Sequence, residues 1–182
     1  MINGQSVLAI IPARGGSKRC PGKNLRLFRG KSLIEWAYEA ALGSRYIDHV
    51  YCSTEDAEIK AHALALGCLV IDRPAELAND TAMNEDVLRH ALELRPHDWV
   101  VLLQPTSPLR TAHDIDQCIK MAQAFNPCIS FDEDGKKNGV CYVASAKFLR
   151  DGRYFDTTSI NYTMANARSL DIDYPEQFEC QS

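Results

Sequence analysis

The chain has no apolar run approaching the ~20 residues of a membrane-spanning helix, and it does not begin with the charged and then apolar pattern of a secretory signal. Basic residues are also not in excess, because 20 Lys and Arg stand against 24 Asp and Glu, a net charge of −4. Broad binding to nucleic acid or to a membrane surface favours a large basic face. We therefore expect a cytoplasmic protein that binds neither nucleic acid nor membrane.

Cysteine and histidine are present but lack any spacing that predicts a metal site. The seven cysteines are odd in number, and none belongs to a C-x-x-C pair or to a Cys/His cluster with zinc spacing. Cys52, Cys128 and Cys141 fall in apolar runs, where a free thiol behaves as a small hydrophobic side chain. Cys20 lies among lysines and arginines without a neighbouring histidine, and we interpret it as incidental.

Size and composition indicate one ordinary globular domain over residues 1–182, with 46% apolar and 24% charged residues. Strand and helix patterns alternate along it. Apolar runs predict strands over 7–11, 47–52, 68–71, 99–103, 128–131 and 140–143. Helices are predicted over 32–41, 55–66, 81–94 and 112–124, with Ser32 as the N-cap of the first, Gly43 after its end, and Asn79 or Asp80 as the N-cap of the third. This rhythm predicts an α/β fold with a Rossmann-like, doubly wound and mostly parallel sheet.

The loop after the first predicted strand is the most informative segment. Within about a dozen residues it contains three glycines, a serine and the cations Arg14, Lys18, Arg19 and Lys23. Glycines allow backbone N–H groups to turn toward an anion, and the cations can hold a polyphosphate. The loop contains neither the Walker A spacing nor G-x-G-x-x-G. The alternative interpretation is a flexible basic surface loop.

Other polar residues follow the later strands. Ser53 and Thr54 follow the second strand, Arg73 the third and Gln104 the fourth. In open α/β sheets the ligand lies at the carboxyl ends of the strands, so we expect these groups to meet the glycine-rich loop at one edge.

The segment from Ile10 to Asn24, I-P-A-R-G-G-S-K-R-C-P-G-K-N, resembles the signature of the cytidylyltransferases that activate sialic acid and related nine-carbon ulosonic acids. Four further motifs occur in the right order and strengthen the resemblance: S-T-E-D from Ser53, R-P-A-E-L from Arg73, L-Q-P-T-S-P-L-R from Leu103 and D-I-D from Asp171. The resemblance extends from the first strand almost to the end of the chain. It implies a fold of the nucleotide-diphospho-sugar transferase type.

The resemblance also implies a reaction, the Mg²⁺-dependent transfer of CMP from CTP to the anomeric hydroxyl of a small acidic sugar, a 2-keto-3-deoxy sugar acid. It implies catalytic roles for Arg14, Lys18, Lys23 and Asp173, and Mg²⁺ ligation by Asp171 and Asp173. The implied nucleotide-binding residues are Ala13, Arg14, Gly15, Gly16, Ser17, Lys18, Lys23, Asn24, Arg73 and Asn84. The implied acceptor-binding residues are Gln104, Asn138 and Tyr142.

Four of these residues also have purely structural interpretations. Asp171 and Asp173 stand at i and i+2, which puts two carboxylates on one face of an extended segment, but Asp173 also precedes Pro175 and Glu176 as a helix N-cap would. Arg73 could form a surface ion pair, and Gln104 could satisfy loop backbone groups. Asn138-Gly139 is also a strong turn dipeptide.

The chain departs from the family between Ser130 and Asn138, where only seven residues stand. Family members usually carry several dozen residues there, including cations that approach the sugar carboxylate and an extension that packs on a second subunit. Lys136, Lys137 or Arg168 could replace those cations. We expect a monomer, or a homodimer through another surface. A nucleotidyltransferase with a different sugar acceptor, and a nucleotide-binding homologue impaired in catalysis, remain alternatives.

Overall fold

A seven-stranded sheet forms the centre of the computed structural model, which describes residues 1–155 and 159–179. Its strand order is β5-β4-β1-β6-β8-β7-β9. The strands are β1 (Val7–Pro12), β4 (His49–Thr54), β5 (Leu69–Asp72), β6 (Trp99–Leu102), β7 (Cys128–Phe131), β8 (Lys137–Ser145) and β9 (Ile160–Thr163). β5, β4, β1 and β6 are parallel, whereas β8 runs antiparallel to both β6 and β7. The prediction of a doubly wound, mostly parallel sheet is confirmed.

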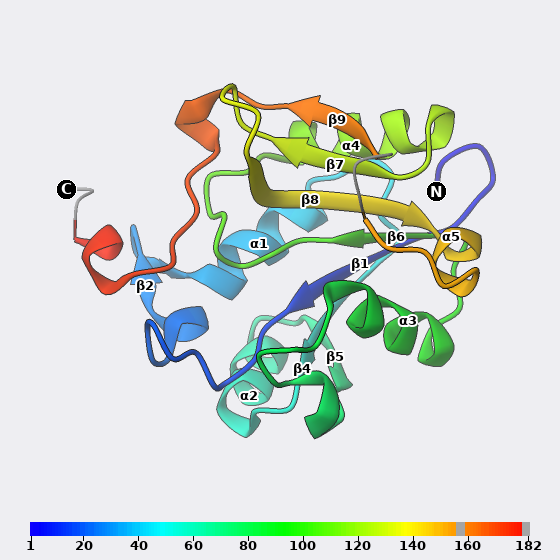
Figure 1. The fold of residues 1–182 in the computed structure, drawn as a ribbon. Helices are drawn as coiled ribbons and strands as arrows, with labels where there is room; N and C mark the ends of the chain where they lie inside the picture. Colours follow the sequence, from blue (N-terminus) through cyan, green and yellow to red (C-terminus); the bar gives the residue numbers. More distant parts are fainter. Residues whose placement is uncertain (156–158, 180–182) are drawn as a thin grey trace.

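Helices cover both faces of this sheet (Figure 1). One buried cluster joins the strands to α1 (Leu33–Leu42), α2 (Ala57–Ala65) and α4 (Ala112–Ala124). A second cluster on the other face joins them to α3 (Asn84–Leu94) and α5 (Ala146–Arg150). β6 is buried along its whole length, as its uninterrupted apolar sequence predicts for a strand covered on both faces.

Helix ends follow the expected capping chemistry in most places. The Ser32 hydroxyl accepts a hydrogen bond from the backbone N–H of Glu35 at the start of α1. Gly43 ends that helix as expected, but with a right-handed φ of −75°. A larger residue there would be crowded, because a Cβ atom on Gly43 would lie 3.0 Å from the Cβ of Ala112.

The predicted start of α3 is wrong by three residues. The helix begins at Asn84, and its N-cap, Met83, offers no side-chain hydrogen bond. The Asn79 side chain instead accepts hydrogen bonds from the N–H groups of Thr81 and Ala82, which forms a local turn ahead of the helix. The side chain of Asp80 turns away from the helix toward the glycine-rich loop.

Several short elements have too little local pattern to be predicted. They are the hairpin of β2 (Leu27–Phe28) and β3 (Lys31–Ser32), helix α5, strand β9, and the 3-10 turns η1 (Lys23–Leu25), η2 (Ala75–Leu77), η3 (Asn166–Arg168) and η4 (Pro175–Phe178). A third buried cluster joins Phe28 and Leu33 to Ile172. This cluster ties the C-terminal segment to the elements that follow the glycine-rich loop.

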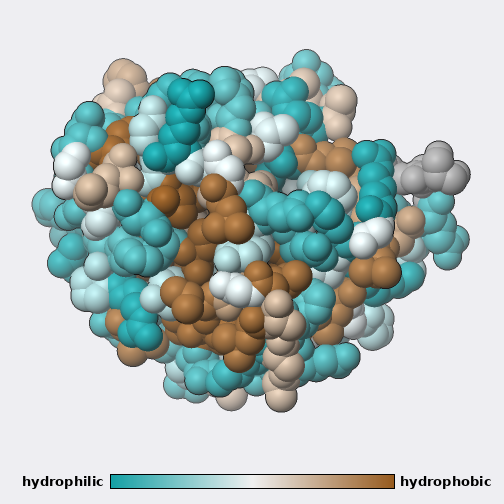
Figure 2. All heavy atoms as spheres, turned by 180° about the vertical axis from the view of Figure 1, so that it is seen from behind, coloured by the Kyte–Doolittle hydropathy of each residue, from teal (hydrophilic) through white to brown (hydrophobic). Residues whose placement is uncertain are grey.

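The face that is turned away from the viewer in Figure 1 carries apolar side chains at its surface (Figure 2). A shallow groove lined by Tyr38, Leu42, Ile47 and Leu69 lies at the amino ends of β4 and β5, remote from the carboxyl ends of the strands. Within residues 1–155 and 159–179, no helix is long and apolar enough to cross a membrane.

A buried carboxylate fastens β9 and η3 to α4. The Asp114 carboxylate accepts hydrogen bonds from the Thr111 hydroxyl at 2.6 Å, from the Tyr162 hydroxyl at 3.0 Å and from two guanidinium nitrogens of Arg168 at 3.1 and 3.2 Å. Burial opposes the charge, but these donors hold the pKa of Asp114 below its usual value.

This network predicts an acid-sensitive contribution to stability. Replacing Asp114 with Asn should lower the free energy of unfolding at pH 7 by about 2–3 kcal/mol, because charged hydrogen bonds to a buried group are lost. The folded pKa lies below the unfolded one, so the stabilisation is present above the unfolded pKa and is lost as the pH falls through the folded pKa. The difference between wild type and variant should therefore shrink from about pH 5 to pH 3 in urea unfolding.

Asp72→Asn is the matched control, because the Asp72 side chain is 77% exposed and pairs with Lys60 at the surface. We expect that variant to lose less than about 1 kcal/mol. Equal losses in the two variants would contradict a special role for Asp114.

Candidate functional site

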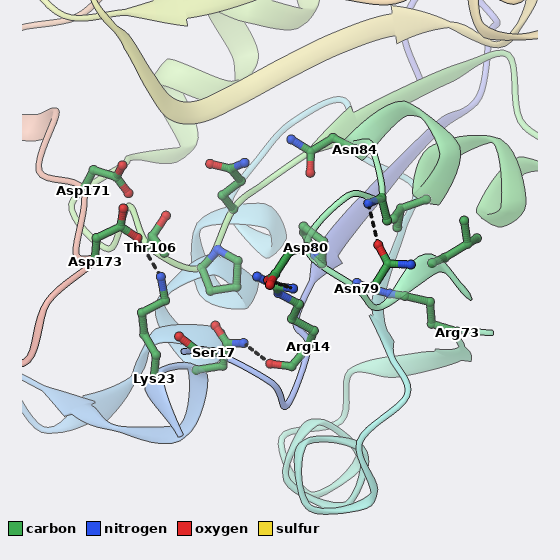
Figure 3. Close-up of a pocket in the computed structure, with 17 residues that line it drawn as sticks. Arg14, Ser17, Lys23, Arg73, Asn79, Asp80, Asn84, Thr106, Asp171 and Asp173 are labelled. Atoms are coloured by element: carbon green, nitrogen blue, oxygen red, sulfur yellow. Dashed lines mark hydrogen bonds and ion pairs between the residues drawn. The ribbon is translucent and has the colours of Figure 1, made fainter. Parts of the chain in front are cut away.

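A cleft of about 360 Å³ lies at the carboxyl ends of the parallel strands (Figure 3). It receives side chains from the loop after β1, from η1, from the end of β5, from the start of α3, from the loop after β6 and from the C-terminal segment. The predicted site residues that line it are Arg14, Ser17, Lys23, Asn24, Arg73, Asn84, Gln104, Asp171 and Asp173. Segments that are far apart in the sequence thus meet at one edge of the sheet.

The glycine-rich loop is held in a defined shape. Gly22 has a φ of +66° and leads into η1, which places Lys23 and Asn24 on the cleft side. The buried amide of Asn24 donates a hydrogen bond to the carbonyl oxygen of Arg14 at 3.0 Å, which closes the loop on itself. Ala13 is fully buried at the end of β1, where its N–H bonds to the Ser53 carbonyl. The loop is therefore built into the fold, which argues against the interpretation as a flexible surface loop.

The two adjacent glycines serve different needs. A Cβ atom on Gly15 would lie 2.3 Å from an oxygen of Asp56, the N-cap of α2, whereas a Cβ on Gly16 would meet nothing within 4 Å. The N–H of Gly15 donates to the Glu55 carboxylate at 2.8 Å. The structure thus assigns that N–H a protein partner, while the backbone around Gly16 has room for a bound group.

Each cation of the loop meets a carboxylate. Arg14 and Lys18 bind the two oxygens of Asp80 at 2.7 and 2.5 Å. Lys23 and Arg19 bind the two oxygens of Asp173 at 2.8 and 3.0 Å. The Lys23 side chain is only 13% exposed, so its ion pair is shielded from solvent more than the others. The loop therefore concentrates positive charge where an anion with several oxygens could replace these carboxylates.

Asp171 and Asp173 lie on the same side of an extended segment, as their spacing predicts (Figure 3). Ile172 between them is fully buried in the third cluster, and its N–H bonds to the Thr106 carbonyl at 2.7 Å. This anchorage turns both neighbouring carboxylates toward the cleft. The interpretation of Asp173 as a helix cap is wrong, because η4 begins after Tyr174 and Gln177 bonds the local N–H groups.

The two carboxylates differ in their electrostatic surroundings. Removal of water by the surrounding protein and the neighbouring charge of Asp173 raise the pKa of Asp171 above its usual value, against the effects of Thr106 and Lys23. Partial burial also opposes the charge of Asp173, but hydrogen bonds and charges from Lys23 and Arg19 lower its pKa. Paired carboxylate oxygens are donors that suit Mg²⁺. Among the described residues no group of three or more His, Cys, Asp or Glu side chains could hold a metal, so a metal here would need further ligands of another kind beside these two carboxylates.

Arg73 is buried, and it is not the surface ion pair considered as its structural alternative. Its Nε donates to the Ser53 hydroxyl at 3.1 Å, and a terminal nitrogen donates to the Ser53 carbonyl. Burial lowers the pKa of the guanidinium, which the charge of Glu55 opposes. Arg73 therefore brings a fixed positive charge to the cleft wall.

The loop after β6 presents Gln104 to the cleft. No hydrogen bond of its side-chain amide is found within the described part of the chain, which leaves the amide available to a ligand. Gly139 permits its position, because a Cβ there would lie 2.2 Å from Oε1 of Gln104. The buried guanidinium of Arg110 fixes the loop from behind through the carbonyl oxygens of Gln104 and Ser107.

Asn138 and Tyr142 lie outside the cleft lining. Asn138 is buried and bonds to Ser130 at 2.7 Å and to Ser169 at 3.1 Å. The turn interpretation of Asn138 is wrong, since β7 and β8 are joined by a turn over 132–136 in which Gly135 has a φ of +77°. Tyr142 lines a smaller hollow of about 250 Å³ that shares Ala82 and Asn84 with the cleft.

The three cations considered as replacements take different places. Lys137 lines this hollow with Tyr142. Lys136 lies near enough to Asp171 to favour its charged form and so oppose the rise in its pKa. Arg168 is held by Asp114 and takes no part in the cleft lining.

Residue-level reasoning missed Asp80, Glu55, Thr106 and Arg110. Glu55 belongs to the motif S-T-E-D, and Thr106 and Arg110 belong to L-Q-P-T-S-P-L-R, but the motifs alone do not give each side chain a role. Asp80 carried a competing signal, because an acidic residue before a helical pattern is typical of an N-cap.

Comparisons with known proteins show which proteins the chain is similar to. A family model described as cytidylyltransferase matches residues 8–168. The N-acylneuraminate cytidylyltransferase of Escherichia coli O18:K1:H7 is 30% identical over 211 aligned positions, which cover 95% of this chain and 50% of that protein. The CMP-N,N'-diacetyllegionaminic acid synthase of Legionella pneumophila is 32% identical over 215 positions, covering 93% of this chain and 91% of that protein.

The chain thus spans about half the length of the E. coli relative. Both alignments exceed the 182 residues of the chain, so each relative carries residues that have no counterpart here. Among solved structures, the CMP:2-keto-3-deoxy-manno-octonic acid synthetase complexed with CTP superposes with a TM-score of 0.79, at 18% identity and 96% coverage of both chains. That likeness supports the fold alone.

The two glycines of the loop provide a matched stability test. Gly15→Ala should lower the free energy of unfolding by about 1–2 kcal/mol, because the new methyl group displaces Asp56 from the cap of α2. Gly16→Ala should change it by less than about 0.5 kcal/mol, as is usual for surface positions. Urea unfolding of both variants measures the difference, and equal stability would show that Gly15 is not required by space.

Proposed function

The chain belongs to the cytidylyltransferase family, and on this basis we propose that it transfers CMP from CTP to the anomeric hydroxyl of a 2-keto-3-deoxy sugar acid of the sialic acid class. Pyrophosphate is the second product. The observation that carries this proposal is the cleft itself, which is lined both by Arg14 and Lys23 of the glycine-rich loop and by the paired carboxylates of Asp171 and Asp173. Relatives named for sialic and legionaminic acid chemistry support the acceptor class.

The glycine-rich loop would bind the triphosphate. Arg14, Lys18 and Lys23 would exchange their carboxylate partners for phosphate oxygens, a charge-assisted contact of similar geometry. These cations then neutralise the charge that develops on the departing pyrophosphate, which lowers the barrier to transfer. Ser17 lines the same cleft, the backbone next to it at Gly16 has open space around it, and Asn24 maintains the loop. Arg73 and Asn84 also line the cleft, and we assign them to the nucleoside.

Asp171 and Asp173 fit a divalent metal, for which we propose Mg²⁺, because they offer two oxygen donors on one face beside the phosphate loop. When bound, the metal would offset phosphate charge and make the acceptor hydroxyl more acidic. Lys23 and Arg19 hold the carboxylate of Asp173 in its charged form, because their hydrogen bonds and charges lower its pKa. When phosphate oxygens take over Lys23, this carboxylate becomes a stronger base, and in that state it accepts the proton of the anomeric hydroxyl.

The acceptor is placed on the side of the cleft where Gln104 lies. Gln104 lines the cleft, and within residues 1–155 and 159–179 no hydrogen bond occupies its side-chain amide, which can therefore meet the sugar hydroxyls. Tyr142 and Lys137 line the adjoining hollow. Within the described residues Lys137 forms no salt bridge, so its ammonium group is available to the sugar carboxylate. Asn138 supports this region from within the fold.

The short β7–β8 link packs on its own chain, since Glu133 and Asn166 exchange two hydrogen bonds of 3.1 Å. A specific interface needs roughly 800 Å² per partner, which a five-residue turn over 132–136 cannot supply alone. We therefore propose a monomer, or a homodimer through another surface.

The transfer reaction is tested by incubating the protein with CTP, Mg²⁺ and a panel of sialic acid, other 2-keto sugar acids and sugar phosphates, with product analysis by mass spectrometry. We expect a CMP-sugar acid and an equal amount of pyrophosphate. The double variant Asp171→Asn, Asp173→Asn should fold and lose turnover by a factor of at least about 100, as when a charge-stabilising group is removed. A CDP-sugar formed from sugar phosphates, with no product from any sugar acid, would contradict the acceptor class.

The acceptor side is tested with lysine variants. Lys137→Ala should raise KM for the sugar acid by about 10-fold or more, the loss expected for one charge-assisted contact, and leave KM for CTP unchanged. Lys147→Ala is the control, because Lys147 is exposed and pairs with Asp151 on α5. An unchanged KM for the sugar acid in Lys137→Ala would remove Lys137 from the acceptor site.

A further inference from the structure

One carboxylate at the mouth of the cleft has no task in the proposed transfer. Asp80 binds Arg14 through one oxygen and Lys18 through the other, at 2.7 and 2.5 Å. The contact joins the glycine-rich loop to the segment before α3, and two of its members, Arg14 and Asp80, line the cleft (Figure 3). A carboxylate that holds two cations in this way occupies them much as a phosphate group would.

The backbone around Asp80 holds this carboxylate in place. The side-chain oxygen of Asn79 accepts hydrogen bonds from Thr81 and Ala82 at 2.8 and 2.9 Å, and its nitrogen donates to the Glu76 carbonyl at 2.8 Å. Asp80 does not cap α3, whose N-cap is Met83. The turn that Asn79 forms therefore directs Asp80 toward the glycine-rich loop, and the Asp80 side chain takes no part in the hydrogen bonds of that turn.

Asp80 also differs from the other carboxylate that pairs with the loop. Asp173 interacts with Asp171, which makes that pair suitable for a metal. Asp80 instead has two cations as its partners, because Lys18 and Arg14 hold its carboxylate and lower its pKa. Its side chain is 44% exposed, so an incoming ligand can displace it without breaking buried structure.

We propose that the Asp80 carboxylate binds Arg14 and Lys18 in the ligand-free protein until a polyphosphate displaces it. This inference rests on the proposed function and names an affinity-determining residue of the same site. Because CTP and pyrophosphate must each displace Asp80 in order to bind, the affinity of the protein for both ligands is lower than it would be without this carboxylate. It also gives pyrophosphate a competitor for its two cations, which favours its release after transfer.

The test is calorimetric titration of wild type and Asp80→Asn with inorganic pyrophosphate and with CTP, both in the presence of Mg²⁺ and at low salt. Asp80→Asn should bind both ligands about 2- to 10-fold more tightly, the range expected when exposed ion pairs no longer compete. Asp86→Asn is the matched control for net charge, because Asp86 pairs with Arg89 on α3 and lies outside the cleft lining. That control should bind as the wild type does.

A double-mutant cycle separates competition from positioning. Lys18→Ala should reduce pyrophosphate affinity by a larger factor in the Asp80→Asn background than in wild type, since Lys18 is then released from its protein partner. Unchanged or weaker binding by Asp80→Asn would overturn the inference and make Asp80 a positioning residue or a bystander. If wild type bound neither CTP nor pyrophosphate, the proposed function itself would fail, which is a distinguishable outcome.

Discussion

The ion pair between Lys23 and Asp173 is the contact on which the site depends. It joins the loop after the first strand to a segment 150 residues later, and the lysine side chain is largely shielded from water. The pairing requires Gly22 to turn η1 toward the cleft and Ile172 to anchor the C-terminal segment in the third cluster. A buried apolar residue between two aspartates thus determines where the carboxylates of the site lie.

The balance of charge explains why carboxylates lie beside the cations of the site. The cleft gathers cations that would repel one another, and carboxylates from distant segments offset them in pairs. A triphosphate carries the same kind of oxygen donors on one molecule, so it can take over those contacts while a metal takes over the freed aspartates. The fold supplies rigid positions for these groups, and the proposed chemistry is an exchange of anions among them.

Much of this could be predicted from local sequence. The apolar runs give the strands of the parallel half, and polar residues directly after strands must lie at the carboxyl edge. Elements defined by tertiary contacts could not be predicted. β9 depends on pairing with β7 and on the bonds to Asp114, and the start of α3 depends on the turn that Asn79 forms. The place of Asp80 in the site could not be predicted for the same reason, because its partners Arg14 and Lys18 lie 66 and 62 residues earlier in the chain.

A crystal structure with CTP and Mg²⁺ tests the central claim most directly, namely that one cleft binds both the triphosphate and the metal. We expect phosphate oxygens on Arg14, Lys18 and Lys23, and a metal ion bound by Asp171 and Asp173. A nucleotide whose phosphates lie away from the glycine-rich loop, or a metal held without these two aspartates, would contradict it.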